Sequence, residues 1–194
     1  YETMSSLGRV MDDCGKGTPV QHLAKAAGFS KKTLVVHANR LINADIEMLQ
    51  RVGADVVHCP RSHAWFGHAN FDCDRLAKAG VNICIGTDSL ASTGGETAVM
   101  GLNMFAEMQE LSRNHPKLPC EDLLQMATAN GATALGLGDE IGLLKEGLIA
   151  NMAVIPYSDS VSSVPEAIVQ HSCPVAMLMI EGKRAFSGID SIVD

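Results

Sequence analysis

Three short apolar runs in the first half of the sequence each end on a polar residue whose side chain can bind a metal or move a proton. They are residues 33–36 before His37, residues 55–57 before His58, and residues 81–87 before Asp88. Helix-like stretches over residues 43–52 and 70–79 lie between the runs. The order strand, helix, strand, helix, strand is typical of parallel pairing with crossover helices. The sequence therefore predicts an α/β chain.

Polar residues that directly follow parallel strands meet at one edge of the sheet, where barrel enzymes build their active sites. A carboxylate such as Asp88 at a buried strand end is costly unless it is paired or bound to a metal. Two plainer interpretations stay open at this point. A histidine after a strand is often satisfied by a buried hydrogen bond, and Asp88 can act as a helix N-cap or a loop brace.

The rest of the sequence predicts packing helices followed by a β-rich tail. We expect Asn43 to N-cap the helix over residues 43–52. Further helices are expected over residues 18–28, over residues 96–112, and from Pro119 or Glu121 to Leu135. Strands are expected over residues 152–155, 175–180 and 184–186, the last two joined by a turn at residues 181–183. We therefore divide the chain into residues 1–146 and a small β-rich module over residues 147–194.

The composition disfavours several function classes. The 194 residues include 15 basic and 22 acidic side chains, giving a formal charge of -7, and the basic residues are scattered, which disfavours a nucleic-acid partner. No apolar run approaches the ~20 residues that a spanning helix needs, so no membrane partner is expected. The six cysteines form no CxxC pair, and we expect a reducing, cytoplasmic setting.

Three motifs carry a family resemblance. They are Leu-Val-Val-His-Ala-Asn-Arg-Leu at residues 34–41, His-Cys-Pro-Arg-Ser-His at residues 58–63, and Gly-Thr-Asp-Ser at residues 86–89. These motifs resemble strands six, seven and eight of the amidohydrolase superfamily, in the subgroup of cytosine, guanine, S-adenosylhomocysteine and triazine hydrolases. The segment over residues 127–142 resembles the family's closing helix and its return into a β-sandwich. The resemblance implies the C-terminal half of a TIM (β/α)8 barrel, plus part of a small β-sandwich domain.

The resemblance also implies roles for three residues. Asp88 matches the aspartate that binds the metal and takes the proton from its water. His37 matches the histidine that orients the hydroxide and steadies charge on the tetrahedral intermediate. Glu2, in the opening Tyr-Glu-Thr, matches the carboxylate that passes a proton to the ring nitrogen. The implied function is therefore deamination, or less often dechlorination, of a nitrogen heterocycle.

Substrate contacts are expected from four residues at or after the second apolar run: His58, Ser62, His63 and Trp65. His63 stands where such sites usually carry Asn, so its contacts are expected to differ from the common pattern. Trp65 and Phe66 fit a stacking surface for a planar ring and a hydrophobic plug under the loop equally well. His63 and His68 can also be exposed and inert.

The implied cofactor is one divalent metal, zinc first and iron second, since both accept His and Asp ligands. Two alternatives to a deaminase stay open: hydrolysis of the C–N bond of a cyclic amide or lactam, and a non-catalytic fragment. The family's His-x-His pair and its strand-five histidine have no counterpart here, and a whole barrel takes ~250 residues. We therefore expect that an N-terminal half of the same protein completes the site. Self-association is left open.

Overall fold

A parallel sheet organises the first half of the molecule. The structure, a computed structural model of the chain, describes residues 2–8, 10, 15–25, 29–93, 101–157 and 164–187. The sheet has the order β1-β2-β3, with β1 (Leu34–Val36), β2 (Asp55–His58) and β3 (Ile83–Ile85). Both strand pairs are parallel, and Val36 is in register with Val57 as His58 is with Ile85. The predicted parallel order is confirmed.

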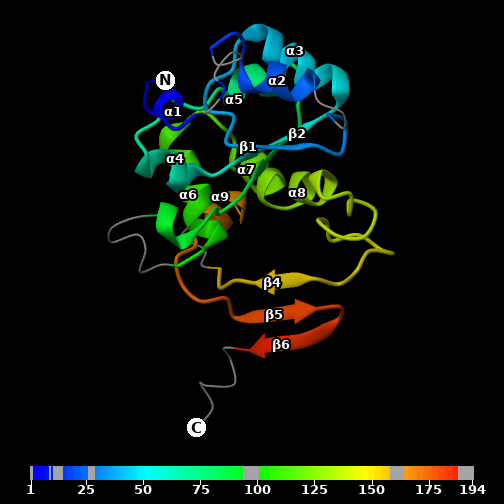
Figure 1. Cartoon of the computed structure of the whole chain (residues 1–194). Helices are drawn as coiled ribbons and strands as arrows, with labels where there is room; N and C mark the ends of the chain where they lie inside the picture. Colours follow the sequence, from blue (N-terminus) through cyan, green and yellow to red (C-terminus); the bar gives the residue numbers. More distant parts are fainter. Residues whose placement is uncertain are drawn as a thin grey trace.

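Helices pack on both sides of this sheet. Figure 1 shows α2 (Pro19–Lys25), α3 (Asn43–Val52) and α5 (Cys73–Lys78) above it. Helices α6 (Met104–Asn114), α7 (Cys120–Ala127) and α8 (Ala129–Ala134) lie below it, and all three contact β3. Leu49, Val56, Leu76 and Leu123 are fully buried between these layers. Strand β1 is less protected, since Leu34 and Val36 on one of its faces are 37% and 49% exposed.

Helix α3 shows how local chemistry sets an element. Its predicted range of residues 43–52 is confirmed. The prediction of Asn43 as N-cap is wrong, because Asn43 is already helical and its side chain instead accepts a hydrogen bond from Arg75. At the N-terminal end of α3, Oδ2 of Asp45 instead accepts a hydrogen bond from the backbone N–H of Ile42 at 3.1 Å. Gly53 ends the helix with a left-handed φ of 68°.

Other helix boundaries differ from the predictions. The helix expected over residues 96–112 is α6, which begins only at Met104 because Asn103 caps it through the N–H groups of Phe105 and Ala106. Residues 94–100 lie outside the described residues. The helix expected to end at Leu135 is broken at Thr128, where φ and ψ of -131° and -90° separate α7 from α8. Helix α4 (Pro60–Trp65) was not predicted, although Pro60 stands at its first position.

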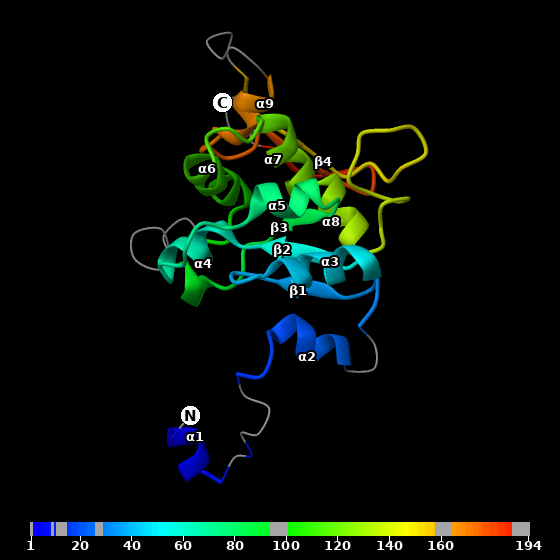
Figure 2. The ribbon, with the colours of Figure 1, turned by 90° about the horizontal axis from the view of Figure 1, so that it is seen from above.

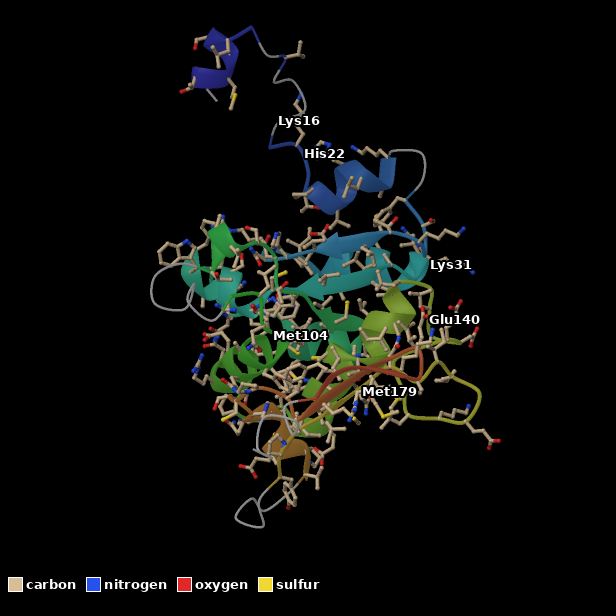
Figure 3. All side chains as sticks on the ribbon, turned by 90° about the horizontal axis from the view of Figure 1, so that it is seen from below. Lys16, His22, Lys31, Met104, Glu140 and Met179 are labelled. Atoms are coloured by element: carbon tan, nitrogen blue, oxygen red, sulfur yellow. The ribbon has the colours of Figure 1, made fainter. Side chains whose placement is uncertain are left out.

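The tail forms a second sheet, as predicted. Strands β4 (Met152–Val154), β5 (Met177–Ile180) and β6 (Lys183–Ser187) are antiparallel in that order, and a short helix, α9 (Val164–Val169), packs against α6 and α7. Lys16 and His22, near the N-terminal end, lie far from Met179 on β5 (Figure 3). Helix α1 (Glu2–Ser6) stands apart from the parallel sheet (Figure 2).

Two properties bear on the expected setting of the chain. Within the described ranges, no helix is both long and apolar enough to cross a lipid bilayer. The cysteines at positions 59, 73, 84, 120 and 173 are all free thiols. Position 14 lies outside the described residues.

Gly86, directly after β3, supplies a first test. A Cβ at this position would lie 2.9 Å from Cγ1 of Val57 and 3.4 Å from Sγ of Cys59. We predict that Gly86→Ala lowers the free energy of unfolding by about 1–3 kcal/mol, because the added methyl overpacks the β2–β3 contact. Denaturant unfolding measures this change.

Gly131 in α8 is the matched control, because no atom lies within 4 Å of a Cβ built there. Gly131→Ala should leave stability unchanged or raise it by up to about 1 kcal/mol through helix propensity. Equal effects of the two substitutions would contradict the packing described here.

Candidate active site

The ends of the parallel strands bring His37 and Asp88 together. The N–H of His37 donates to Val57 O, and the N–H of Gly86 donates to His58 O, each at 2.8 Å. These bonds extend the sheet by one residue and place the loops after β1 and β3 side by side. Nε2 of His37 lies 3.9 Å from Oδ2 of Asp88, with side chains 44% and 28% exposed. The expected convergence of these two residues is present.

Both residues adopt an unusual backbone conformation. His37 has a φ of 72°, Ala38 of 49° and Asp88 of 55°. Left-handed φ values are uncommon outside glycine and cluster at functional sites, where surrounding contacts hold them. The chain therefore turns sharply just after β1 and shortly after β3. The turns set the positions of the two side chains at the strand ends.

Asp88 is held as a carboxylate. Oγ of Ser62 donates to its Oδ2 at 2.7 Å. This hydrogen bond is the main cause that lowers the pKa of Asp88, and hydrogen bonds from Ser92 and Ser89 and the nearby His37 act in the same direction. Asp88 is consequently ionised at neutral pH and can act as a ligand or as a proton acceptor.

A pocket of about 300 Å³ opens beside this pair. Its lining residues are His37, Asn39, Ser62, His63, Phe66, His68 and Asp88. Rings form one wall, since the ring centroids of Phe66 and His68 are 6.1 Å apart and those of His63 and His68 are 5.3 Å apart. Charged and polar groups face this aromatic wall. The pocket thus combines three rings, tilted against one another, with an ionised carboxylate.

His63 braces the pocket from within the protein. Its Nδ1 lies 3.0 Å from Oδ1 of Asn39 and its Nε2 lies 2.6 Å from Ala69 O. The ring is buried, and this burial is the main cause that lowers its pKa, so the neutral form is favoured. A neutral ring carries one N–H and donates to only one of these two oxygens, while its other nitrogen lies against the second. His63 thus sits between the loop after β1 and the loop after α4.

Of the other predicted site residues, His58 and Trp65 do not line the pocket. His58 is 2% exposed and its ring stacks on Phe71, with centroids 3.9 Å apart. Trp65 is 55% exposed. Glu2 begins α1, but its side chain lies outside the described residues. The roles expected for these three residues remain predictions.

Three lining residues have no single role assigned from the sequence: Asn39 has none, Phe66 stays open between a stacking surface and a plug, and His68 stays open as exposed and inert. Asn39 follows His37 by two positions, and Phe66 and His68 lie in the loop after α4. Their proximity to the strand ends was a usable signal. The decisive information, which side chains turn inward, depends on how α4 packs and could not be read from the sequence.

The metal expected from the sequence can be compared with the side chains present. In the described part of the chain, no three or more His, Cys, Asp and Glu side chains gather where they could hold a metal ion. Asp88 nevertheless fits as one ligand, because its ionised carboxylate is partly exposed toward the pocket. The imidazole of His37 lies beside it.

Comparisons with known proteins concern the family and the fold. The model of the amidohydrolase family matches residues 6–185. A 5-methylthioadenosine/S-adenosylhomocysteine deaminase from Thermococcus onnurineus is 33% identical over 158 residues, which cover 81% of this chain and 37% of that protein. The chain spans less than half the length of the curated relatives it matches.

Solved structures give the same result. An adenosine deaminase from Xanthomonas campestris with bound zinc superposes with a TM-score of 0.81 at 26% identity, covering 91% of this chain and 42% of that one. The E. coli guanine deaminase superposes with a TM-score of 0.70, covering 81% of this chain and 40% of its own. At 22% identity, the second likeness concerns the fold alone.

The buried ring of His58 predicts a pH dependence of stability. Burial, followed by the neighbouring histidines, lowers the pKa of His58 from 6.5 to about 3. The folded protein therefore keeps this ring neutral, whereas the unfolded chain binds a proton below pH 6.5. The contribution to stability is fully present above pH 6.5. It is lost progressively as the pH falls toward the folded pKa.

His58→Phe should remove this dependence and keep the stack on Phe71. We predict that the difference in free energy of unfolding between variant and wild type changes by about 1.4 kcal/mol per pH unit below pH 6.5, in favour of the variant. Denaturant unfolding from pH 8 to pH 5 measures it. A difference that stays constant with pH would show that His58 titrates normally.

Proposed function

The chain belongs to the amidohydrolase family, and from this premise we propose that it forms the C-terminal part of a metal-dependent hydrolase that replaces an exocyclic amino group on a nitrogen heterocycle by water. One observation carries the proposal. An ionised Asp88 and the imidazole of His37 lie 3.9 Å apart after the ends of β3 and β1, the two strands that flank β2 in the parallel sheet, beside a pocket with an aromatic wall. Oxygen and nitrogen groups of this kind suit hydrolytic chemistry.

The proposal extends to the architecture. We assign β1, β2 and β3 to strands six, seven and eight of a (β/α)8 barrel within residues 1–146, and residues 147–194 to strands of a β-sandwich. The exposed Leu34 and Val36 support this assignment, because side chains of further barrel strands would cover that apolar face. The greater length of the relatives also supports it. The N-terminal half would bring the histidines that bind the metal together with Asp88.

Asp88 is proposed as the metal ligand that this chain contributes, with zinc favoured over iron by the zinc-bound adenosine deaminase among the similar structures. A divalent metal in such a site supplies Lewis-acid charge that lowers the pKa of water from about 15.7 toward about 7. Asp88 would accept the proton released there, since its carboxylate is ionised at neutral pH. His37, whose Nε2 lies near Asp88, would orient the attacking oxygen.

Other residues are proposed to handle the substrate. Glu2 would pass a proton to the ring nitrogen, so that ammonia departs. The rings of Phe66 and His68 offer flat faces on which a planar heterocycle can stack. Ser62 and His63, which were expected to touch the substrate, also line the pocket, but their polar atoms hold Asp88, Asn39 and Ala69. Of the two residues considered for stacking, Trp65 and Phe66, we propose this role for Phe66, together with His68.

The names of the relatives favour a purine amino group over a lactam. Relatives are named 5-methylthioadenosine/S-adenosylhomocysteine deaminase, and similar structures include an adenosine deaminase. We propose adenosine-type nucleosides as the first substrates to test. Ammonia release from a panel of purines, pyrimidines and lactams by the full-length protein separates the deaminase from the cyclic amide hydrolase. Ring opening of a lactam with no ammonia release would favour the latter.

Asp88→Asn tests the central residue. We predict a loss of turnover of at least about 10²-fold, because the amide cannot accept the proton, and a weaker retention of metal. Steady-state kinetics and metal analysis of the full-length protein measure both. Asp72→Asn is the control, since the Asp72 carboxylate pairs with Arg75 on the surface. Near-wild-type turnover in Asp88→Asn would refute the assignment.

A further inference from the structure

A buried ion pair lies directly behind the pocket. Glu107, on α6, is fully buried, and Arg61, on α4, is 5% exposed. The N–H of Arg61 donates to Oε2 of Glu107 at 2.9 Å, and its Nη1 lies 3.6 Å from Oε1. The same Nη1 donates to Gly101 O at 2.8 Å. One carboxylate thus holds both the backbone and the side chain of a single arginine.

The backbone contact fixes the start of α4. Arg61 is the second residue of this helix, and its N–H is one of the first N–H groups of a helix, which have no acceptor within the helix. Glu107 supplies that acceptor at the helix start, where the macrodipole favours negative charge. Burial raises the pKa of the Glu107 carboxyl to about 7, while the hydrogen bond from Arg61 and its charge act in the opposite direction. The neighbouring residue along α4 is Ser62, which is 2% exposed.

Ser62 carries the contact to the reactive carboxylate. Its hydroxyl donates to Oδ2 of Asp88 at 2.7 Å. Asp88 stands on a left-handed backbone with a φ of 55° and keeps 28% of its side chain exposed. Ser89 and Ser92, which follow Asp88 in the chain, also hydrogen-bond to this carboxylate. Ser62 is the contact that comes from α4, so this part of the orientation of Asp88 depends on the start of that helix.

We propose that Glu107 is a positioning residue: it anchors Arg61 so that the Ser62 hydroxyl stays hydrogen-bonded to Asp88 and orients that carboxylate. Stability alone explains the pair poorly, because a buried ion pair often stabilises a fold no better than apolar side chains of the same size. What the ion pair does provide is one fixed position for the next residue, Ser62. The functional consequence rests on the proposed function of Asp88, whereas the geometric consequence does not.

The geometric test compares crystal structures of two variants of the full-length protein. In Glu107→Gln the charge opposite Arg61 is lost and one of the two side-chain oxygens becomes an NH2 donor, so the side chain can no longer accept from both the N–H and the guanidinium of Arg61. We expect the Ser62 Oγ to Asp88 Oδ2 distance to grow from 2.7 Å to beyond about 3.5 Å, where it no longer counts as a hydrogen bond. The matched control is Glu110→Gln, on the same helix, whose carboxylate pairs with Arg113 nearer the surface. That variant should keep the hydrogen bond.

An unchanged Ser62–Asp88 bond in Glu107→Gln would overturn the proposal. If Glu107→Gln does not fold, Glu107→Asp replaces it, because the shorter side chain keeps the charge but withdraws it from Arg61. The same displacement of Ser62 is expected there. A folded Glu107→Asp protein with the bond intact would overturn the proposal equally.

The functional test titrates metal-free full-length protein with zinc alone. Groups that orient a metal ligand typically change metal affinity by about 10–100-fold, so Glu107→Gln and Ser62→Ala should each weaken zinc binding by about 10-fold or more. Glu107 and Ser62 are proposed to act through one hydrogen bond. The double variant should therefore lose no more zinc affinity than the single variant that binds zinc more weakly. The turnover number kcat should fall together with the affinity for zinc, while KM changes little.

The outcomes separate the two proposals. Losses that multiply in the double variant, or a lowered melting temperature with unchanged zinc affinity and kcat, would assign Glu107 a purely structural role. A wild-type protein that binds neither zinc nor iron would instead contradict the proposed function. The crystal structures would then still decide whether Glu107 positions Ser62.

Discussion

Parallel pairing of three strands is the constraint on which the rest of the structure depends. Val36 is in register with Val57, and His58 with Ile85, so the strands end at one level. Two loops and helix α4 leave this edge and carry His37, Asp88 and Ser62 into one small volume. A register slip by one residue in either strand pair would turn the side chains of the slipped strand to the opposite face of the sheet. The site residues would then no longer meet. Burial of β2 and β3 holds this register.

Backbone strain is concentrated just after the ends of β1 and β3. Left-handed backbone at His37, Ala38 and Asp88 costs on the order of 1–3 kcal/mol per residue. Hydrogen bonds from the N–H of His37 to Val57 O and from Ser62 to Asp88 offset part of it. Behind them, the Arg61–Glu107 pair and the His63 bridge fix the α4 segment from two sides. The Arg61–Glu107 pair and the contacts of His63 thus support the residues that line the open pocket.

The sequence predicted the parallel sheet, the helix over residues 43–52, the antiparallel tail and the meeting of His37 with Asp88. These features follow from local patterns, namely apolar runs, a stop at Gly53 and polar residues after strands. It did not predict that His58 stacks beneath the pocket on Phe71, or that Glu107 reaches Arg61 across 46 residues of chain. Such contacts depend on how α4 and α6 pack. No local pattern contains that information, and the break at Thr128 likewise shows only in the backbone angles.

The central claim, that Asp88 holds a catalytic metal at the end of β3, is tested most directly by a crystal structure of the zinc-loaded full-length protein measured at the zinc absorption edge. The account predicts an anomalous peak within about 2.0–2.2 Å of an Asp88 carboxylate oxygen, with Ser62 still hydrogen-bonded to that side chain. A zinc ion bound elsewhere, with Asp88 outside coordination distance, would contradict it.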